Sequence, residues 1–401
     1  MSKIQKLKAL HFGAGNIGLG FIGQLLIKSN FVVYFADIDE NILKILSLEK
    51  KYLVNELGKR LITKEIRGIN VVHSNDIKVI SLIGEVDLIT TSVGVNVLKD
   101  ISLIIAKGLI LRSNKKNFHP LNIISCENLI YATNYLYQQI IKYIPTKLHN
   151  FIHDYIGFIN SSVDRIVPLK TTKEDKKLSV NVESFYEWVV DKNQFKGLIP
   201  NIHGVKFKNN LIYYIERKIF TLNTGHAITA YLGNIYGYQK IIEAISDDRI
   251  YKIVLGAMQE TGEFLIKKYN LKPESHYLYI NKTISRFKNI YINDSIVRVA
   301  RNPIQKLKFN ERFIRPLLGT LKYNLSNSNL LIGIASVLHY RHPKDIESNR
   351  LHNFIQKEGI YKTLVNFCGL DNNHKKILFC ILNSYFDLSK YYLKKIKLLS
   401  S

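Results

Sequence analysis

The chain has 401 residues, 46% of them hydrophobic, which is enough for a sizeable buried core and suggests two or more domains. A disordered protein is thereby excluded. The formal net charge of +25 would suit a nucleic-acid partner, but the lysines are spread along the chain and no arginine-rich block or RNA-binding aromatic motif appears. We therefore expect no nucleic-acid partner, although a basic surface can steer anionic substrates toward a protein.

The three cysteines, Cys126, Cys368 and Cys380, show neither C-x-x-C spacing nor an even number, so the sequence predicts no zinc site and no disulfide framework. This fits a reducing cytoplasm. No apolar run reaches the roughly eighteen residues of a membrane span, so we expect no membrane partner and no export. The oligomeric state stays open because no coiled-coil seam appears, and we expect a monomer.

A glycine-rich turn follows the first predicted strand. A short apolar run leads into G-x-G-x-x-G, and the residues from Phe21 to Ile27 then predict a helix. Gly13 allows a tight turn, Gly15 lets a pyrophosphate approach the backbone, and Gly18 lets the helix pack closely on the strand, with its N-terminus facing the phosphates. The candidate cofactor-binding residues here are Ala9, Leu10, His11, Phe12, Gly13, Ala14, Gly15, Asn16, Ile17, Gly18, Leu19 and Gly20.

A second apolar strand, residues 31–36, ends in Asp37, about twenty residues past the turn, which is the position of the acidic residue in dinucleotide-binding units. A carboxylate there accepts hydrogen bonds from both ribose hydroxyls of NAD, and it would repel the additional phosphate of NADP. Strand, turn, helix, strand and acid together predict NAD as the cofactor.

Short apolar strands alternate with helical stretches through the first half of the chain, which predicts an α/β fold with a parallel sheet covered by helices. Further strands are expected at 86–91 and 122–126, and their polar ends would border a bound nucleotide. We also expect a charged loop at Thr171–Lys177 and one strand at Val180–Val189, which contains Trp188.

From about residue 206 the pattern changes to long helices, including 252–269 and 330–339, and the Lys-rich tail at 390–397 predicts a solvated helix face. The sequence therefore predicts an N-terminal Rossmann domain that binds NAD, residues 1–205, and a mainly α-helical substrate and catalytic domain, residues 206–401.

Residues 215–233 predict one helix that carries Lys218, Asn223 and His226. At about 100° per residue, Asn223 and His226 lie within about 140° of Lys218, on one half of the cylinder. Taken alone, a solvated polar face with a satisfied histidine is the simpler interpretation. Oxidation of a secondary alcohol, however, needs a base and stabilisation of the alkoxide, which a lysine with a lowered pKa and an amide donor supply.

In this scheme Lys218 is the general base, Asn223 donates amide protons toward the alkoxide oxygen, and His226 bonds the substrate hydroxyl or holds Lys218 in place. Asn160 offers a second donor from the other domain. The presence of all three helix residues argues against the other class of function, a basic nucleic-acid binder or an NAD-binding sensor without catalysis.

The residues resemble those of the polyol-specific long-chain dehydrogenases, the mannitol dehydrogenase family. The resemblance runs over nearly the whole chain and is carried by the glycine turn, by Asn-Ser-Ser-Val-Asp-Arg-Ile-Val-Pro at 160–168, by Asp-Lys-Asn-Gln-Phe-Lys-Gly at 191–197, and by the Lys-x4-Asn-x2-His spacing from Lys218. It implies a Rossmann domain followed by a helical domain, no catalytic metal, and NAD-linked interconversion of mannitol 1-phosphate with fructose 6-phosphate.

Two positions depart from the family pattern. Leu19 stands where close relatives usually have Arg, so one cation for a phosphate or substrate contact is lost. Asn160 matches the branch that acts on free mannitol, whereas the phosphate-specific branch often has Asp there. A related polyol or hexuronate dehydrogenase with an unphosphorylated substrate is therefore the alternative.

Other family-like residues have less specific roles. We expect Asp164 and Arg165 to be a structural pair behind the site. A substrate phosphate needs cations, for which arginine is best suited. The candidates are Arg312, Arg315, Lys322 and Arg341, with Arg315 and Arg341 preferred.

Overall fold

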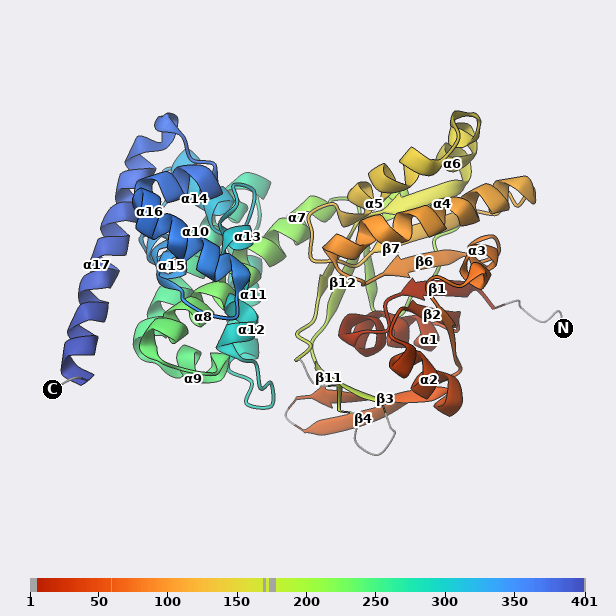
Figure 1. The fold of residues 1–401 in the computed structure, drawn as a ribbon, viewed down its shortest axis with the longest axis horizontal. Coiled ribbons are helices and arrows are strands. Elements are labelled where there is room, and N and C mark those ends of the chain that lie inside the picture. Colours follow the sequence, from red (N-terminus) through yellow and green to blue (C-terminus); the bar gives the residue numbers. More distant parts are fainter. Residues whose placement is uncertain (1–5, 59, 169–170, 173–177, 400–401) are drawn as a thin grey trace. The chain divides into compact units, whose positions relative to one another are not determined.

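The computed structural model describes residues 6–58, 60–168, 171–172 and 178–399. The chain divides into two compact units, Met1–Ile215 and Glu216–Ser401 (Figure 1), so the division falls within the helix α7, Leu211–Glu216. Within the described ranges, no helix is both long and apolar enough to cross a membrane.

A six-stranded parallel sheet forms the centre of the first unit. Its strand order is β5-β2-β1-β6-β7-β8, and every neighbouring pair is parallel, which confirms the predicted sheet. The four strands expected from the sequence are present, and β5 and β8 complete the sheet. The strands are β1 Lys8–Phe12, β2 Val32–Asp37, β5 Ile69–His73, β6 Leu88–Thr91, β7 Leu121–Ser125 and β8 Ile156–Ile159.

Helices cover both faces of this sheet. Alternate residues of β1 enter two different hydrophobic clusters, with Ala9 in one and Leu10 and Phe12 in the other. Because β1 contributes to both clusters, its side chains must be apolar on both faces, as is usual for strands of parallel sheets. Figure 1 shows α4 and α5 over one face and α1 and α2 over the other. The helices are η1 Gly18–Gly23, α1 Gln24–Lys28, α2 Glu40–Glu49, α3 Ile77–Ile83, η2 Val95–Val97, α4 Leu98–Asn114, α5 Ala132–Ile140, η3 Ile141–Tyr143, η4 Thr146–Leu148 and α6 His149–Tyr155.

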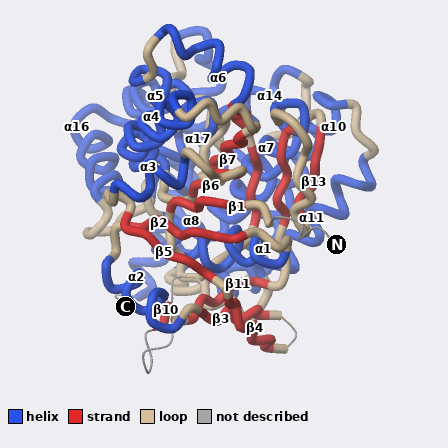
Figure 2. Tube along the Cα trace, turned by 90° about the vertical axis from the view of Figure 1, so that its right-hand side faces the viewer, coloured by secondary structure: helices blue, strands red, loops and turns tan. Residues whose placement is uncertain are grey.

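Two smaller sheets complete the first unit. One has the order β10-β11-β3-β4 and the other β13-β12-β9; Figure 2 shows the β3, β4 and β11 region beside the main sheet. The strands are β3 Lys51–Leu57, β4 Leu61–Arg67, β9 Ser161–Asp164, β10 Thr171–Thr172, β11 Ser179–Glu183, β12 Glu187–Asp191 and β13 Val205–Lys208, with the short helix η6 Lys192–Gln194 after β12.

These sheets correct two expectations. The single strand predicted at Val180–Val189 is wrong, because β11 and β12 are separate strands that belong to different sheets. The loop expected at Thr171–Lys177 is wrong at its start, where Thr171 and Thr172 pair with β11. The rest of that segment lies outside the described residues.

The second unit is helical, as predicted, and α8 lies at its centre. Ten of the thirteen residues of α8 are buried, so the helix is enclosed on nearly all sides, and it packs against α9, α10, α12 and α15. The elements are η7 Arg217–Asn223, α8 Thr224–Tyr236, α9 Ile241–Ser246, α10 Asp248–Tyr269, α11 Pro273–Phe287, α12 Ile296–Ala300, α13 Pro303–Leu307, α14 Ile314–Lys322, α15 Ser328–His339, α16 Ile346–Cys368, η8 Asn372–His374 and α17 Lys375–Leu399.

The expected helices at 252–269 and 330–339 lie within α10 and α15, and the Lys-rich tail belongs to α17. Lys390 is exposed, whereas the later side chains of that tail lie outside those the structure describes.

Candidate active site

The glycine turn between β1 and η1 depends on the absence of side chains. Gly13 has φ +105°, and a Cβ there would lie 2.9 Å from the Ser92 carbonyl oxygen. A Cβ on Gly18 would lie 1.9 Å from the Gly13 carbonyl oxygen, so the helix can approach the turn only with glycine. Gly15 is exposed, and a Cβ there would meet no atom within 4 Å. The backbone is thus tightly packed at Gly13 and Gly18, whereas the space beside Gly15 is free of protein atoms from the described part of the chain.

The helix after the turn begins as a π-helix, η1, where the sequence predicted a regular helix from Phe21. In a π-helix the bonded pairs are five residues apart, so some carbonyls need other partners. Tyr52 donates to the Leu19 carbonyl at 2.9 Å, and Arg165 donates to the Gly20 carbonyl at 2.9 Å. The Leu19 side chain is 1% exposed in the hydrophobic core, which leaves only its backbone for a cofactor.

Arg165 is a buried anchor of this turn. Its guanidinium also donates to the Glu183 carbonyl at 2.9 Å and lies 3.4 Å from the Glu56 carboxylate. It therefore ties η1 to β11 and β3, which agrees with a structural role behind the site.

His11 lies beneath the turn. Its Nδ1 is 2.6 Å from the Thr90 hydroxyl, and its Nε2 is 2.9 Å from the Ser92 hydroxyl. Burial lowers the pKa of His11 to about 3, although a hydrogen bond with the Gly13 backbone opposes this shift. The ring is therefore neutral at physiological pH and joins β1 to β6. The His11 side chain is buried, as are those of Ala9, Leu10 and Phe12, so these four residues support the turn from the interior of the domain.

Asp37 ends β2 next to the same turn. Its Oδ2 accepts a hydrogen bond from the Ala14 N–H at 2.5 Å, and its Oδ1 accepts from the N–H groups of Ile38 at 2.7 Å and Asp39 at 2.9 Å. Three backbone donors thus fix the half-buried carboxylate beside the glycine turn.

Polar groups gather at the carboxyl ends of β6 and β7. The Glu127 carboxylate accepts hydrogen bonds from the Thr91 hydroxyl at 2.8 Å and from the Val93 N–H at 3.1 Å. Burial raises the pKa of Glu127, against the effect of these donors. Ligands of such sheets bind beyond this edge.

Asn160 follows β8 in the first unit. Its Nδ2 donates to the Asn134 side chain at 2.6 Å, and its backbone N–H donates to the Gln194 side chain at 2.7 Å. Its Oδ1 is buried and has no hydrogen-bond partner among the described residues. A buried polar atom without a partner is costly, and a bound ligand is one way to satisfy it.

In the second unit, the helix that carries Lys218 differs from the prediction. Residues 215–233 form the end of α7, then the π-helix η7, then α8, so they are not one regular α-helix. Residues five apart stack above one another in a π-helical turn, as residues four apart do in an α-helix. Lys218 and Asn223 are five apart within η7, and His226 follows Asn223 by three residues in α8. The π-helix therefore brings the three side chains onto one face, closer together than regular spacing would.

The two polar residues after Lys218 have different surroundings. Among the described residues, the buried Asn223 Nδ2 has no hydrogen-bond partner. The His226 ring stacks on Phe287, with centroids 4.9 Å apart, and its Nε2 lies 3.1 Å from the Asp294 carboxylate. Burial lowers the pKa of His226, and Asp294 opposes this.

Asp294 is itself held by two groups. Arg298 binds it with two contacts, of 2.5 Å and 2.6 Å. Burial alone would raise the pKa of Asp294, but His226 and Arg298 together hold it well below its usual range. His226 is thus oriented by an ionised, anchored carboxylate.

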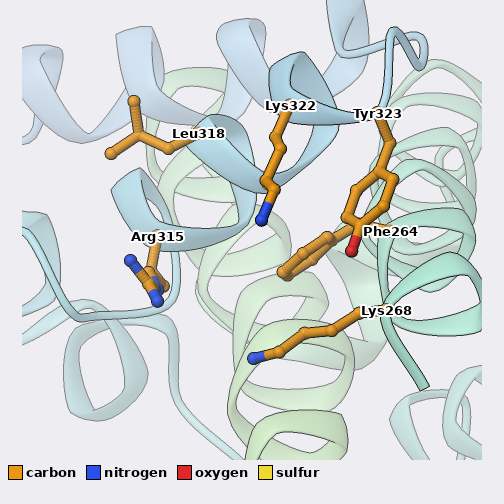
Figure 3. A pocket seen from close by; sticks show the side chains of 7 residues that line it. Phe264, Lys268, Arg315, Leu318, Lys322 and Tyr323 are labelled. Atoms are coloured by element: carbon orange, nitrogen blue, oxygen red, sulfur yellow. The ribbon is translucent and has the colours of Figure 1, made fainter.

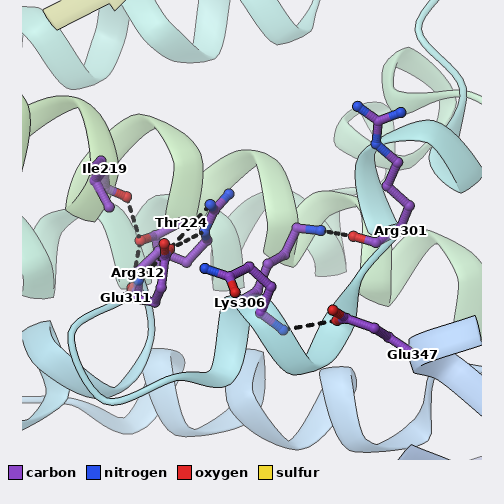
Figure 4. A network of polar contacts seen from close by, with 8 residues as sticks. Ile219, Thr224, Arg301, Lys306, Glu311, Arg312 and Glu347 are labelled. Atoms are coloured by element: carbon purple, nitrogen blue, oxygen red, sulfur yellow. Dashed lines mark hydrogen bonds and ion pairs between the residues drawn. The ribbon is translucent and has the colours of Figure 1, made fainter. Parts of the chain in front are cut away.

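The segment from Asp294 to Arg312 runs beside α8 and supplies cations that sequence reasoning largely missed (Figure 4). The Arg312 carbonyl accepts a hydrogen bond from the Thr224 hydroxyl at 2.7 Å, directly after Asn223 in the chain. Lys306 is buried and donates to the Arg301 carbonyl. Burial, then Arg312 and Arg301, lower the pKa of Lys306 to about 7. No motif marks Lys306, and only its burial in the fold distinguishes it from the other lysines.

The other expected cations lie elsewhere. Arg315 and Lys322 line a separate cavity on α14. The Arg341 guanidinium donates to the carbonyls of Leu338 and Tyr340, at 3.1 Å and 2.8 Å, near the end of α15. Among the candidates for phosphate binding, Arg312 is thus joined to the helix of Asn223 through its backbone carbonyl, and its guanidinium pairs with the Glu311 carboxylate at 3.2 Å.

In the described parts of the chain, no three His, Cys, Asp or Glu side chains gather as metal ligands would.

Comparison with known proteins gives consistent matches. A model of the mannitol dehydrogenase Rossmann domain matches residues 7–204, and one of the mannitol dehydrogenase C-terminal domain matches residues 210–373. Mannitol-1-phosphate 5-dehydrogenase of Buchnera aphidicola subsp. Schizaphis graminum is 46% identical over 391 residues, covering 96% of this chain and 100% of the relative. The enzyme of the same name from B. aphidicola subsp. Acyrthosiphon pisum (strain APS) is 45% identical over 377 residues, covering 94% and 97%.

Two solved structures share the fold. A Pseudomonas fluorescens mannitol 2-dehydrogenase in ternary complex with NAD and D-mannitol matches with a TM-score of 0.82 at 18% identity, covering 99% of this chain and 95% of that one. A D-sorbitol dehydrogenase in substrate-free form matches with a TM-score of 0.79 at 17% identity, covering 97% and 94%.

Proposed function

Because this chain belongs to the mannitol dehydrogenase family, we propose that it is an NAD-dependent oxidoreductase that interconverts mannitol 1-phosphate and fructose 6-phosphate. The observation that carries the proposal is the 46% identity, over 96% of the chain, to a relative with that substrate in its name. Residues 1–205 are proposed to bind NAD, and residues 206–401 to bind and convert the substrate.

The residues of the first unit suit NAD. The open edge at Gly15 leaves room for a pyrophosphate beside the backbone, and the fixed Asp37 carboxylate suits a ribose diol. The cofactor-binding residues in this proposal are Asp37 and the turn from Ala9 to Gly20. Within that turn, the buried side chains of His11 and Leu19 support the backbone and do not contact the cofactor. When bound, NAD would supply the acceptor for a hydride from the alcohol carbon, and NADH would supply the hydride for the reverse reaction.

Proton transfer is the task of the second unit. Lys218 is the proposed general base for the substrate hydroxyl, and the unpartnered Asn223 Nδ2 is the proposed donor to the oxygen as negative charge develops on it. His226 is proposed to bond the hydroxyl or to position Lys218, and its contact with Asp294, which orients the ring, supports this role. Asn160 of the first unit is proposed to take part as well. Because its Nδ2 already donates to Asn134, the suited atom is its Oδ1, which has no partner among the described residues and can accept a hydrogen bond from a polyol hydroxyl, in place of the donor expected from the sequence.

Recognition of the phosphate is proposed for Arg301, Lys306 and Arg312. Along the segment that packs beside α8, the Lys306 ammonium contacts the Arg301 backbone carbonyl, and the Arg312 guanidinium pairs with Glu311 at 3.2 Å. Burial, then Arg312 and Arg301, lower the pKa of Lys306, so a nearby negative charge would favour its protonated form. Arg315 and Arg341 are no longer the preferred candidates, because Arg315 lines the cavity on α14 and the Arg341 guanidinium donates to the carbonyls of Leu338 and Tyr340. A dianionic phosphate among three cations forms charge-assisted hydrogen bonds that free mannitol lacks.

The proposal also includes a monomeric protein in the cytoplasm. The alternative is an unphosphorylated polyol or hexuronate as substrate, which Asn160 favours. Addition of fructose 6-phosphate to the purified protein with NADH tests the activity, and a loss of NADH absorbance is the expected result. A loss of NADH absorbance with fructose, but not with fructose 6-phosphate, would establish the alternative instead.

A further inference from the structure

A cavity of about 350 Å³ lies between α10 and α14, apart from the proposed active site. Figure 3 shows Lys268 and Lys322 extending toward the same space beside the Phe264 ring. Its volume falls in the range of small-ligand pockets. The lining residues are Phe264, Lys268, Arg315, Leu318, Gly319, Lys322 and Tyr323.

The charge in this cavity is positive. Lys268 contacts both oxygens of the Glu216 carboxylate at 2.6 Å. Neither Arg315 nor Lys322 forms an ion pair with any residue that the structure describes, and both are exposed. Three cations thus share one carboxylate, and the surplus of two matches a dianionic phosphate, which guanidinium and ammonium groups bind through charge-assisted hydrogen bonds.

An apolar wall accompanies the cations. Phe264 is 4% exposed, and its ring lies 6.2 Å from that of Tyr323, measured between centroids. Gly319 lets the Phe264 ring pack directly against α14, because a Cβ there would lie 2.5 Å from that ring. A ligand with a carbon skeleton as well as a phosphate therefore fits better than an inorganic anion.

Two residues that line the cavity, Lys268 and Phe264, contact the helix that carries Lys218. Lys268 binds Glu216, two residues before Lys218, and Phe264 packs against Phe220, two residues after it, with centroids 6.3 Å apart. Side chains two positions apart on a helix point to nearly opposite sides. Anything bound in the cavity therefore lies behind the face of Lys218, Asn223 and His226.

We propose that this cavity is an effector site for a small phosphate monoester. An anion bound there competes with Glu216 for Lys268, and Glu216 adjoins the first residue of η7. Binding thus perturbs the π-helix that aligns the proposed catalytic residues. The binding claim is independent of the function proposed above, whereas its effect on turnover rests on that function.

Isothermal titration with glucose 6-phosphate, a phosphate monoester other than the proposed substrates, tests the site. The double variant R315A/K322A should bind at least about tenfold more weakly than the unaltered protein. The control K267A/K344A removes two other exposed lysines, and it should bind as the unaltered protein does. The variant K306M should keep the binding, since it alters only the proposed substrate site. Free glucose should give no heat of binding.

Three outcomes would overturn the proposal: no binding to the unaltered protein, equal affinity in R315A/K322A, or loss of binding in K306M alone. Turnover supplies the second readout, because glucose 6-phosphate should change the rate of the unaltered protein and of K267A/K344A but not of R315A/K322A. Binding without any effect on rate would refute the effector role. A protein that binds at this cavity but never oxidises mannitol 1-phosphate would refute the proposed function and leave the binding site standing.

Discussion

Lys218 is the residue on which the proposed chemistry depends most. Replacement by Ala should lower turnover by at least about a hundredfold, the usual lower range for a general base, while NADH binding to the first unit stays nearly unchanged. Stopped assays of turnover and fluorescence titration with NADH measure the two effects separately. An equal loss of NADH affinity, or of folding as judged by circular dichroism, would show that Lys218 is structural.

Asp37 should set the choice between NAD and NADP. The variant D37S removes the carboxylate and should relax a strong preference for NAD, because a 2′-phosphate is no longer repelled. Since the carboxylate also accepts from the Ala14 N–H, D37N serves as the control that keeps an acceptor oxygen and loses the charge. Ratios of kcat/KM for the two cofactors give the comparison, and an unaltered protein that uses both equally would contradict this role.

Lys306 makes stability depend on pH in a definite direction. Its pKa is about 7 in the folded protein, against 10.5 as the ordinary value, so the unfolded chain binds more protons between these limits. Relative to K306M, the unaltered protein should be least stable below pH 7 and should gain stability as the pH rises toward 10. Urea unfolding at pH 6, 8 and 9.5 measures the difference. If the difference in unfolding free energy between the two proteins did not change with pH, the pKa of Lys306 would not be lowered in the folded protein.

At the scale of elements, η7 depends on contacts with its neighbours. Thr221 of η7 contacts buried His276 of α11, with 3.2 Å between the hydroxyl and Nε2, and burial and then Arg217 lower the pKa of that histidine to about 4. The other ring nitrogen, Nδ1, already has no partner among the described residues.

The isosteric variant T221V should therefore destabilise the protein by about 1–3 kcal/mol, the cost of leaving a buried polar group unsatisfied. The matched control is T229V, because the hydroxyl of the equally buried Thr229 bonds, among the described residues, only to the Gly225 carbonyl of its own helix. Denaturant midpoints provide the test. Equal losses in the two variants would show that the contact with His276 adds nothing.

The elements also show what the sequence can predict. The strand-turn-helix unit was predictable because the strands are apolar on both faces and glycine is sterically required at Gly13 and Gly18. By contrast, β4 is exposed at nearly every residue and so lacks the alternation that marks a strand. The division of residues 180–189 between two sheets, and the π-helical form of η7, depend on tertiary contacts that a local pattern does not contain.

For the candidate site as well, local patterns predict some features and tertiary contacts determine the others. The residues Lys218, Asn223 and His226 were found from their spacing, but their alignment on one face depends on η7. Lys306 was missed because its special environment arises from Arg301, Arg312 and burial together. In this account, the spacing along the chain was enough to predict the proposed catalytic residues, whereas the cations proposed for the phosphate become apparent only in the folded structure.

At the scale of the whole molecule, the two units have separate tasks in this account. The first holds the glycine turn and Asp37, and the second holds the aligned helix and the cations beside α8. The net charge of +25 gives the protein a field that attracts anionic substrates and weakens as salt screens it.

The most direct test of the central claim is the ratio of kcat/KM for mannitol 1-phosphate to that for free mannitol, measured with NAD at fixed ionic strength. The account predicts a ratio of at least about a hundred, because charge-assisted contacts to the phosphate are available to only one of the two substrates. The variant R301A should reduce this ratio mainly through the KM of the phosphate ester. Equal efficiency with both substrates would contradict the assignment of a phosphate-specific dehydrogenase.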